Sequence, residues 1–171
     1  LYLAIKDKRE PPAPGKTEPP ETALRMHNLP IYPTPFLGRE LELDKLGKLL
    51  AVKEMRVVTI LGAGGMGKTR LALEAARGQL EHLMHGSCFV RLSPLQSVDA
   101  IVPTIASALG FSFYGEGEPR QQLLSYLRGK NMLLVLDNFE HLLGGVGLVT
   151  EILQTAPDVT ILVTSRARLN V

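Results

Sequence analysis

Cysteine and tryptophan are almost missing from this sequence, which holds one cysteine and no tryptophan in 171 residues. A single cysteine excludes an internal disulfide and a zinc site built on several cysteines. Cys88 lies in the apolar run Ser87 to Leu92, which is typical of a buried strand, so we assign it a packing role. The four histidines do not have the spacing of metal ligands, so we expect no zinc site.

Long apolar runs and a large net charge are also lacking. No run approaches the roughly 18 apolar residues that a membrane-spanning helix needs. Charged residues between Lys6 and Glu10 leave no secretory apolar segment near the start. We therefore expect a cytoplasmic protein with no membrane partner. The net charge is only +2, so we expect no direct nucleic-acid binding by this chain.

Proline is concentrated at one end, because residues 1–35 contain eight of the twelve prolines. With no lasting apolar period after Ile5, this composition predicts a Pro-rich linker over 1–35 that lies along a surface or is partly mobile. Leu1 to Ile5 would be the last turn of a helix in an upstream domain. The chain starts with Leu and stops soon after its last apolar run. We therefore expect a piece of a longer protein, with one domain over 36–171 that is incomplete at its C-terminal end.

The most specific motif is a glycine-rich run that follows the apolar segment Val57 to Leu61 and precedes a helical pattern. It matches G-x-x-x-x-G-K-[ST] and consists of Gly62, Ala63, Gly64, Gly65, Met66, Gly67, Lys68 and Thr69, with Arg70 directly after it. Such glycines let backbone N–H groups surround a phosphate at the start of a helix. Lys68 would reach the outer phosphates, and the Thr69 hydroxyl would bind Mg²⁺. We predict that the whole run and Arg70 bind a nucleotide.

Apolar strand patterns alternate with helical patterns along the rest of the chain. This alternation predicts an α/β fold of the P-loop NTPase type, with a mainly parallel sheet of about four strands and helices on both faces. The expected strands are 57–61, a run around Phe89, 131–137 and 159–164. The expected helices follow Glu40 and Thr69 and cover 100–109, 120–127 and 148–153. In such sheets, ligands bind beyond the carboxyl ends of the strands.

Two charged residues stand at these strand ends. Asp137 closes the run 131–137, where a carboxylate can hold Mg²⁺ together with Thr69, although an Asp at this position is often only a turn former. Arg166 follows the run 159–164, where a guanidinium could reach a terminal phosphate. A plain surface arginine is the alternative.

The residues after Asp137 bear on catalysis. Many hydrolysing relatives of this loop carry a second acid directly after the magnesium-binding Asp, but this sequence has Asn138 there. An amide can hydrogen-bond a water molecule, but it cannot take its proton at neutral pH. Glu140 could act as the base from another angle, or it could be a helix N-terminal acid that favours the dipole. Hydrolysis is therefore expected to be slow.

In combination these motifs resemble the STAND class of signalling P-loop ATPases, in its NB-ARC-like branch found in bacterial transcriptional regulators of LuxR and SARP type. The resemblance rests on residues 36–40, the glycine-rich run, residues 133–141 and residues 162–166. It implies that Phe36, Leu37 and Arg39 lie near adenine and that 164–166 sense phosphate. It also implies a further strand, a helical lid and a winged-helix module after Val171, and a DNA-binding domain before Leu1.

Three functions fit the motifs. The first is a switch module that binds Mg²⁺ with ATP or ADP, hydrolyses ATP slowly and changes the arrangement of other domains of the same polypeptide. The second is a P-loop kinase for a small molecule, although no Arg-rich lid segment follows Asp137. The third is a nucleotide-locked scaffold without turnover. Oligomerisation of a full-length protein stays open.

Overall fold

A four-stranded parallel sheet forms the centre of the computed structural model, which describes residues 27–169. Its strands are β1 (Val57–Leu61), β2 (Ser87–Arg91), β3 (Met132–Asp137) and β4 (Val159–Ser165), in the order β1-β4-β3-β2. All three pairings are parallel, so the expected parallel α/β sheet is confirmed. The helical turn expected at Leu1 to Ile5 lies outside the described residues.

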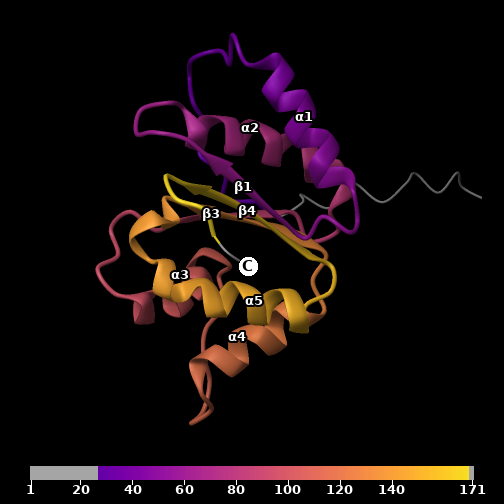
Figure 1. Ribbon diagram of the computed structural model, residues 1–171. Helices are drawn as coiled ribbons and strands as arrows, with labels where there is room; N and C mark the ends of the chain where they lie inside the picture. The colour runs from indigo at the N-terminus through magenta and orange to yellow at the C-terminus, as the bar shows by residue number, and fades with distance from the viewer. Residues whose placement is uncertain (1–26, 170–171) are drawn as a thin grey trace, which may run out of the picture.

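Helices cover both faces of the sheet (Figure 1). On one face lie α1 (Glu40–Ala51) and α2 (Lys68–Gln79), and on the other lie α3 (Ile101–Ala108), α4 (Pro119–Arg128) and α5 (Val146–Thr155). Short 3-10 turns occupy Leu80–His82, Val98–Ala100, Phe139–His141 and Leu143–Gly145. Between residues 27 and 169, no helix has the length and apolar character needed to cross a membrane.

Alternation along the strands divides the core into two apolar clusters. In β3, Leu134 and Leu136 belong to the cluster on the α3, α4 and α5 side, whereas Leu133 and Val135 belong to the cluster with α1 and α2. Every residue of β3 is buried, as expected for a strand covered on both faces. Cys88 packs in the first cluster, and burial raises the pKa of its thiol to about 12 although a hydrogen bond with Asn28 opposes the shift.

Two glycines lead into helix α5. Gly144 and Gly145 end the 3-10 turn Leu143–Gly145, and α5 begins at the next residue. A Cβ atom on Gly145 would lie 2.4 Å from Cδ1 of Ile101, so a glycine here allows the turn to pack against α3.

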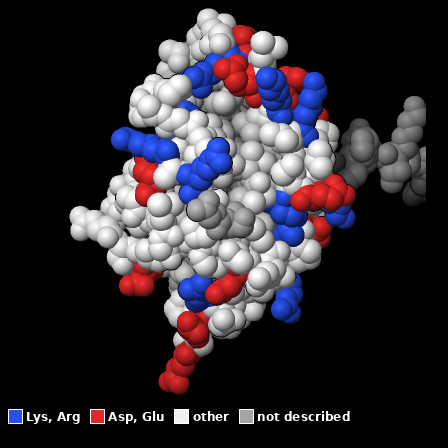
Figure 2. All heavy atoms as spheres, in the orientation of Figure 1, with Lys and Arg blue, Asp and Glu red and all other residues white. Residues whose placement is uncertain are grey.

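The surface carries both signs of charge interspersed, without a large basic patch on the face shown in Figure 2.

Residues 27–35, the described end of the expected linker, run along the domain surface. The side chain of Asn28 pairs with the backbone of Phe89 in edge strand β2, donating to its C=O (2.8 Å) and accepting from its N–H (2.6 Å). Leu29 is buried in the cluster with α1 and α2, and Arg77 of α2 donates to the carbonyl of Pro30. The segment therefore protects part of the free edge of β2, which is otherwise exposed to strand pairing.

We predict that Asn28→Ala lowers the free energy of unfolding by about 1–3 kcal/mol, because it leaves the N–H and C=O of Phe89 without their partner. Urea unfolding followed by circular dichroism measures the change. Asp44→Ala is the control, since it breaks only the exposed Lys48–Asp44 ion pair and should change stability by less than about 1 kcal/mol. Equal stability of Asn28→Ala and the parent protein would show that residues 27–35 do not hold the edge.

Candidate nucleotide-binding site

The sheet order brings three strand ends together. Because β4 lies between β1 and β3, the end of β4 is next to the glycine-rich loop on one side and next to Asp137 on the other. Leu61, the last residue of β1, is in register with Ser165, and the N–H of Gly62 donates to the carbonyl of Ser165 at 3.3 Å. Arg166 therefore follows directly beside the start of the loop.

The loop and the start of α2 form an anion site made of backbone. Gly65 and Gly67 have left-handed φ angles of 76° and 72°, which residues with a Cβ atom rarely adopt. Gly67 is the N-cap of α2, so the N–H groups of the first helical turn have no partner within the helix. Together with the positive end of the helix dipole, these donors favour a phosphate group.

Lys68 folds back over the loop. Its Nζ donates to the carbonyls of Gly62 (2.8 Å) and Ala63 (2.9 Å). An ammonium group has three donors, so these two bonds leave capacity for one more acceptor. The lysine thus closes the loop on itself and keeps its charge at the loop that would hold the phosphates.

The closest side-chain contact of the site joins α2, β3 and β4. The hydroxyls of Thr69 and Thr164 both donate to Oδ1 of Asp137, at 2.6 Å and 2.7 Å. Asp137 is 6% exposed and Thr164 is 1% exposed, so the cluster is shielded from water. Hydroxyl and carboxylate oxygens are ligands that Mg²⁺ takes alongside phosphate and water. Thr69 and Asp137 therefore have the donor atoms and the proximity that the expected metal ion requires.

Asn138 reverses the chain direction after β3. It is the one non-glycine residue with a positive φ angle (68°) between residues 27 and 169, and Asn tolerates this conformation better than most residues. Its N–H donates to Oγ1 of Thr164 at 2.9 Å. The turn places Asn138 on the wall of a cavity that the glycine-rich loop also lines.

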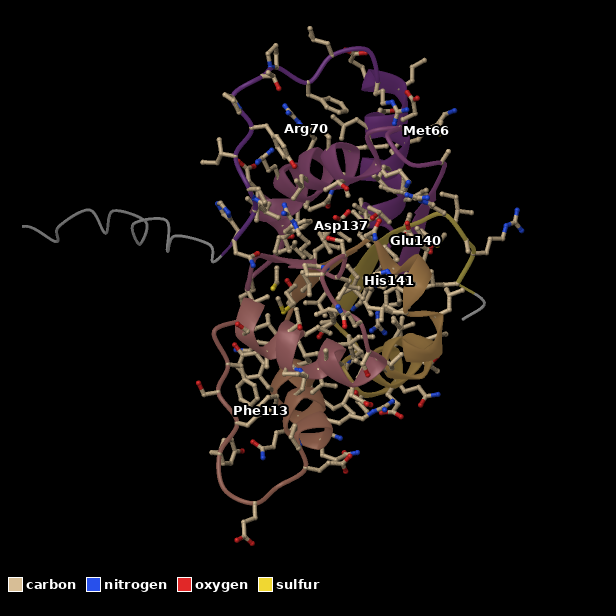
Figure 3. All side chains as sticks on the ribbon, turned by 90° about the vertical axis from the view of Figure 1, so that its left-hand side faces the viewer. Met66, Arg70, Phe113, Asp137, Glu140 and His141 are labelled. Atoms are coloured by element: carbon tan, nitrogen blue, oxygen red, sulfur yellow. The ribbon has the colours of Figure 1, made fainter. Side chains whose placement is uncertain are left out.

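Glu140 is paired with Arg166. Nε of Arg166 lies 3.1 Å from Oε1 of Glu140, and the two side chains are 64% and 16% exposed. The same guanidinium lies over the loop, since a Cβ atom on Gly64 would be 2.9 Å from its Nη2. Figure 3 shows Glu140 close to the level of Asp137, above His141 and below Met66 and Arg70. His141 faces elsewhere and contacts the carbonyl of Leu95 at 3.0 Å.

Two adjoining cavities contain most of the expected site residues. The first, which we call the phosphate cavity because the glycine-rich loop lines it, measures about 390 Å³ and is lined by Tyr32, Gly64, Gly65, Met66, Gly67, Lys68, Thr69, Arg70, Asn138, Thr164 and Arg166. The second, of about 450 Å³, is lined by Pro35, Phe36, Leu37, Gly38, Arg39, Gly65, Met66, Gly67 and Arg70. Asp137 contacts Thr69 and Glu140 contacts Arg166, and Thr69 and Arg166 both line the first cavity. The structure thus brings the expected residues together, while their individual roles stay predictions.

Tyr32 was not expected at the site. Arg70 lies between the two cavities, with its guanidinium 4.6 Å from the ring centre of Tyr32 and its Nη2 2.5 Å from the carbonyl of Thr34. These contacts bring residues 32–34 to the start of α2. In the sequence, Tyr32 lies in a Pro-rich stretch without periodicity. The only signal was an aromatic residue close to Phe36.

We predict that Thr164→Val, which keeps the shape of the side chain, destabilises the protein by about 1–3 kcal/mol, because buried Asp137 loses a donor and the Asn138 N–H loses its acceptor. Denaturant unfolding tests this. Thr150→Val is the matched control, since that hydroxyl makes only a 3.3 Å bond to a carbonyl of its own helix. Equal losses in both variants would contradict a special role for Thr164.

Comparisons with known proteins agree with this arrangement. The family model of the NB-ARC domain matches residues 39–168. A protein of Mycobacterium tuberculosis named as an HTH-type transcriptional regulator is 41% identical over 112 residues, which cover 65% of this chain and 12% of the relative. Regulatory protein AfsR of Streptomyces griseus is 27% identical over 162 residues, which cover 88% of this chain and 16% of that protein. The chain therefore spans only a small part of these relatives.

Solved structures share the fold. The Aeropyrum pernix ORC2 protein, described in complexes with ADPNP and ADP, gives a TM-score of 0.55 at 17% identity, over 74% of this chain and 41% of the other. Cdc6p of Pyrobaculum aerophilum gives 0.54 at 21% identity, over 79% and 40%. At these identities the likeness shows a shared α/β fold of the P-loop NTPase type and no more.

Proposed function

The chain belongs to the NB-ARC family, and on that premise we propose that it binds ATP or ADP with Mg²⁺ as a switch module of a multidomain bacterial regulator, with slow ATP hydrolysis. As a P-loop module of this family it is a nucleotide-binding domain. The switch, the metal ion and the slow rate are the proposed part.

The observation that carries the proposal is the contact between Thr69 and Asp137 at the start of α2. It puts a buried carboxylate beside the anion site formed by the loop. In this proposal the loop N–H groups and Lys68 hold the phosphates, and Thr69 and Asp137 hold Mg²⁺. The ion would neutralise phosphate charge. The ADPNP and ADP complexes of the Aeropyrum pernix protein support the choice of adenine nucleotide through the shared fold.

The second cavity is the proposed site of the base. Phe36, Leu37 and Arg39 line it together with Met66 of the loop, so an adenine placed there would contact apolar side chains of both segments. Arg70 borders both cavities and would lie between base and phosphates. If a guanine nucleotide bound as tightly as ADP, this placement of adenine would be wrong.

The regulator part of the proposal draws on the relatives. Two of them are named as transcriptional or regulatory proteins, and the chain covers 12% and 16% of their lengths. We propose that a DNA-binding domain, a lid and a winged-helix module belong to the same polypeptide in the cytoplasm, and that they respond to the bound nucleotide. Direct contact with nucleic acid would then be made by another domain.

Asn138 supports a second candidate, a nucleotide-locked scaffold. It lines the phosphate cavity at the position where an acid would act as general base. An amide cannot take a proton from water at neutral pH. If ATP were never hydrolysed even in a longer chain, the scaffold would replace the switch. Single-turnover hydrolysis with and without small-molecule acceptors distinguishes both from a kinase.

We predict that Lys68→Ala weakens Mg-ADP binding by about ten- to a hundredfold, the equivalent of losing a charge-assisted hydrogen bond of roughly 1.5–3 kcal/mol. Isothermal titration calorimetry measures both affinities. Lys48→Ala is the control, because this lysine lies on α1 and pairs with Asp44. Equal ADP affinity for Lys68→Ala and the parent chain would refute the proposed site.

A further prediction concerns the rate. In a chain extended past Val171 through the expected lid, Asn138→Asp should raise ATP turnover, since general-base assistance contributes about 10²- to 10⁴-fold. Asp137→Ala should abolish turnover because the metal site is lost. Phosphate release under saturating Mg-ATP is the measurement. In the 171-residue chain neither change should matter, and brisk turnover there would mean that another group already acts as base.

A further inference from the structure

The ion pair between Arg166 and Glu140 holds only one end of the guanidinium. The contact is between Nε of Arg166 and Oε1 of Glu140, at 3.1 Å. The same guanidinium lies over Gly64, and its Nη2, at 2.9 Å, is the guanidinium atom closest to the position of a Cβ atom there. An arginine anchored through Nε therefore presents its Nη donors toward the glycine-rich loop, where the phosphate cavity lies.

The two partners differ in how firmly they are held. Glu140 belongs to the 3-10 turn Phe139–His141, whose first residue is fully buried in the core. Its side chain is 16% exposed, whereas that of Arg166 is 64% exposed. The exposed arginine would sample many rotamers without a partner. The carboxylate of Glu140 is thus the fixed partner, and its contact restricts the rotamers of Arg166.

The second carboxylate oxygen of Glu140, Oε2, is buried and, among the residues that the structure describes, has no hydrogen-bond partner. A carboxylate in such surroundings depends on its remaining contact, here the one with Arg166. If the pair separated, the largely buried carboxylate would lose that contact, which favours the paired orientation of Arg166.

We propose that Glu140 is a positioning residue that makes the site discriminate a nucleoside triphosphate from a diphosphate, by holding the Nη donors of Arg166 toward the loop. It rests on the proposed function, because it requires that the cavity binds nucleotide. In this role Glu140 neither takes a proton from water nor touches the nucleotide. A preoriented arginine loses less conformational freedom when it binds a terminal phosphate, so it binds that phosphate more tightly.

The test compares Mg-ADP with Mg-ADPNP, which differ by the terminal phosphate, on the 171-residue chain by calorimetry. Glu140→Ala should weaken ADPNP binding about tenfold and leave ADP affinity within about twofold. Glu140→Gln keeps an acceptor for Nε at nearly the same size, so it should restore much of the loss. In an Arg166→Ala background, removing Glu140 should have no further effect on either ligand.

Glu151→Ala is the matched control. It breaks the Arg120–Glu151 pair between α4 and α5, which has contacts of 2.8 and 2.9 Å and lies outside both nucleotide cavities. This variant should change neither affinity. Thermal unfolding confirms that each variant is folded before titration, and the nearly isosteric Glu140→Gln gives a result even if Glu140→Ala does not fold.

The outcomes separate this inference from the function on which it rests. Tighter ADPNP binding by Glu140→Ala would overturn the inference, because the carboxylate would then compete with the phosphate for Arg166. An unchanged ADPNP-to-ADP ratio in both Glu140 variants would overturn it as well, and so would a loss that persists in the Arg166→Ala background. In these three cases wild-type ADP binding that depends on Lys68 would leave the proposed function intact. No binding of either nucleotide by the parent chain would overturn both.

Discussion

The hydrogen bonds from Thr69 and Thr164 to a single oxygen of Asp137 are the contact on which the site depends. They join the start of α2 to the ends of β3 and β4 at a point that is almost closed to water. The loop before α2 is thereby fixed relative to the sheet, and the turn at Asn138 is fixed through Thr164. A change at Asp137 would therefore disturb the proposed metal site, the glycine-rich loop and the turn after β3 together.

The sequence predicted those parts of the structure that repeat a simple pattern. Continuous apolar runs marked β3 and β4 because both faces of these strands are covered, and the glycine-rich run marked the loop because its backbone requires glycine. The alternation of strands and helices gave the parallel sheet. It did not give the order β1-β4-β3-β2, which depends on pairing between strands distant in the chain.

Sequence patterns brought Thr69 and Asp137 together, but they did not predict the other side-chain partners at the site. Glu140 was considered as a base or as a helix N-terminal acid, whereas the structure pairs it with Arg166. Residues 27–35 gave no periodic signal, yet Asn28 caps the backbone of β2 and Tyr32 meets Arg70. In each case one or two specific side chains make the contact, and such contacts leave no repeating mark in a sequence.

The site combines rigid groups with one exposed side chain that can move. The phosphate cradle consists of backbone N–H groups and buried oxygens, and it is already formed by the loop, α2 and Asp137. In the proposed function ATP and ADP would both use this part, so it would not distinguish them. A switch can respond only through groups whose contacts differ between the two nucleotides. Arg166 is exposed enough to move and lies close to the loop, so in the proposed switch the response to the terminal phosphate would depend on how its guanidinium is held.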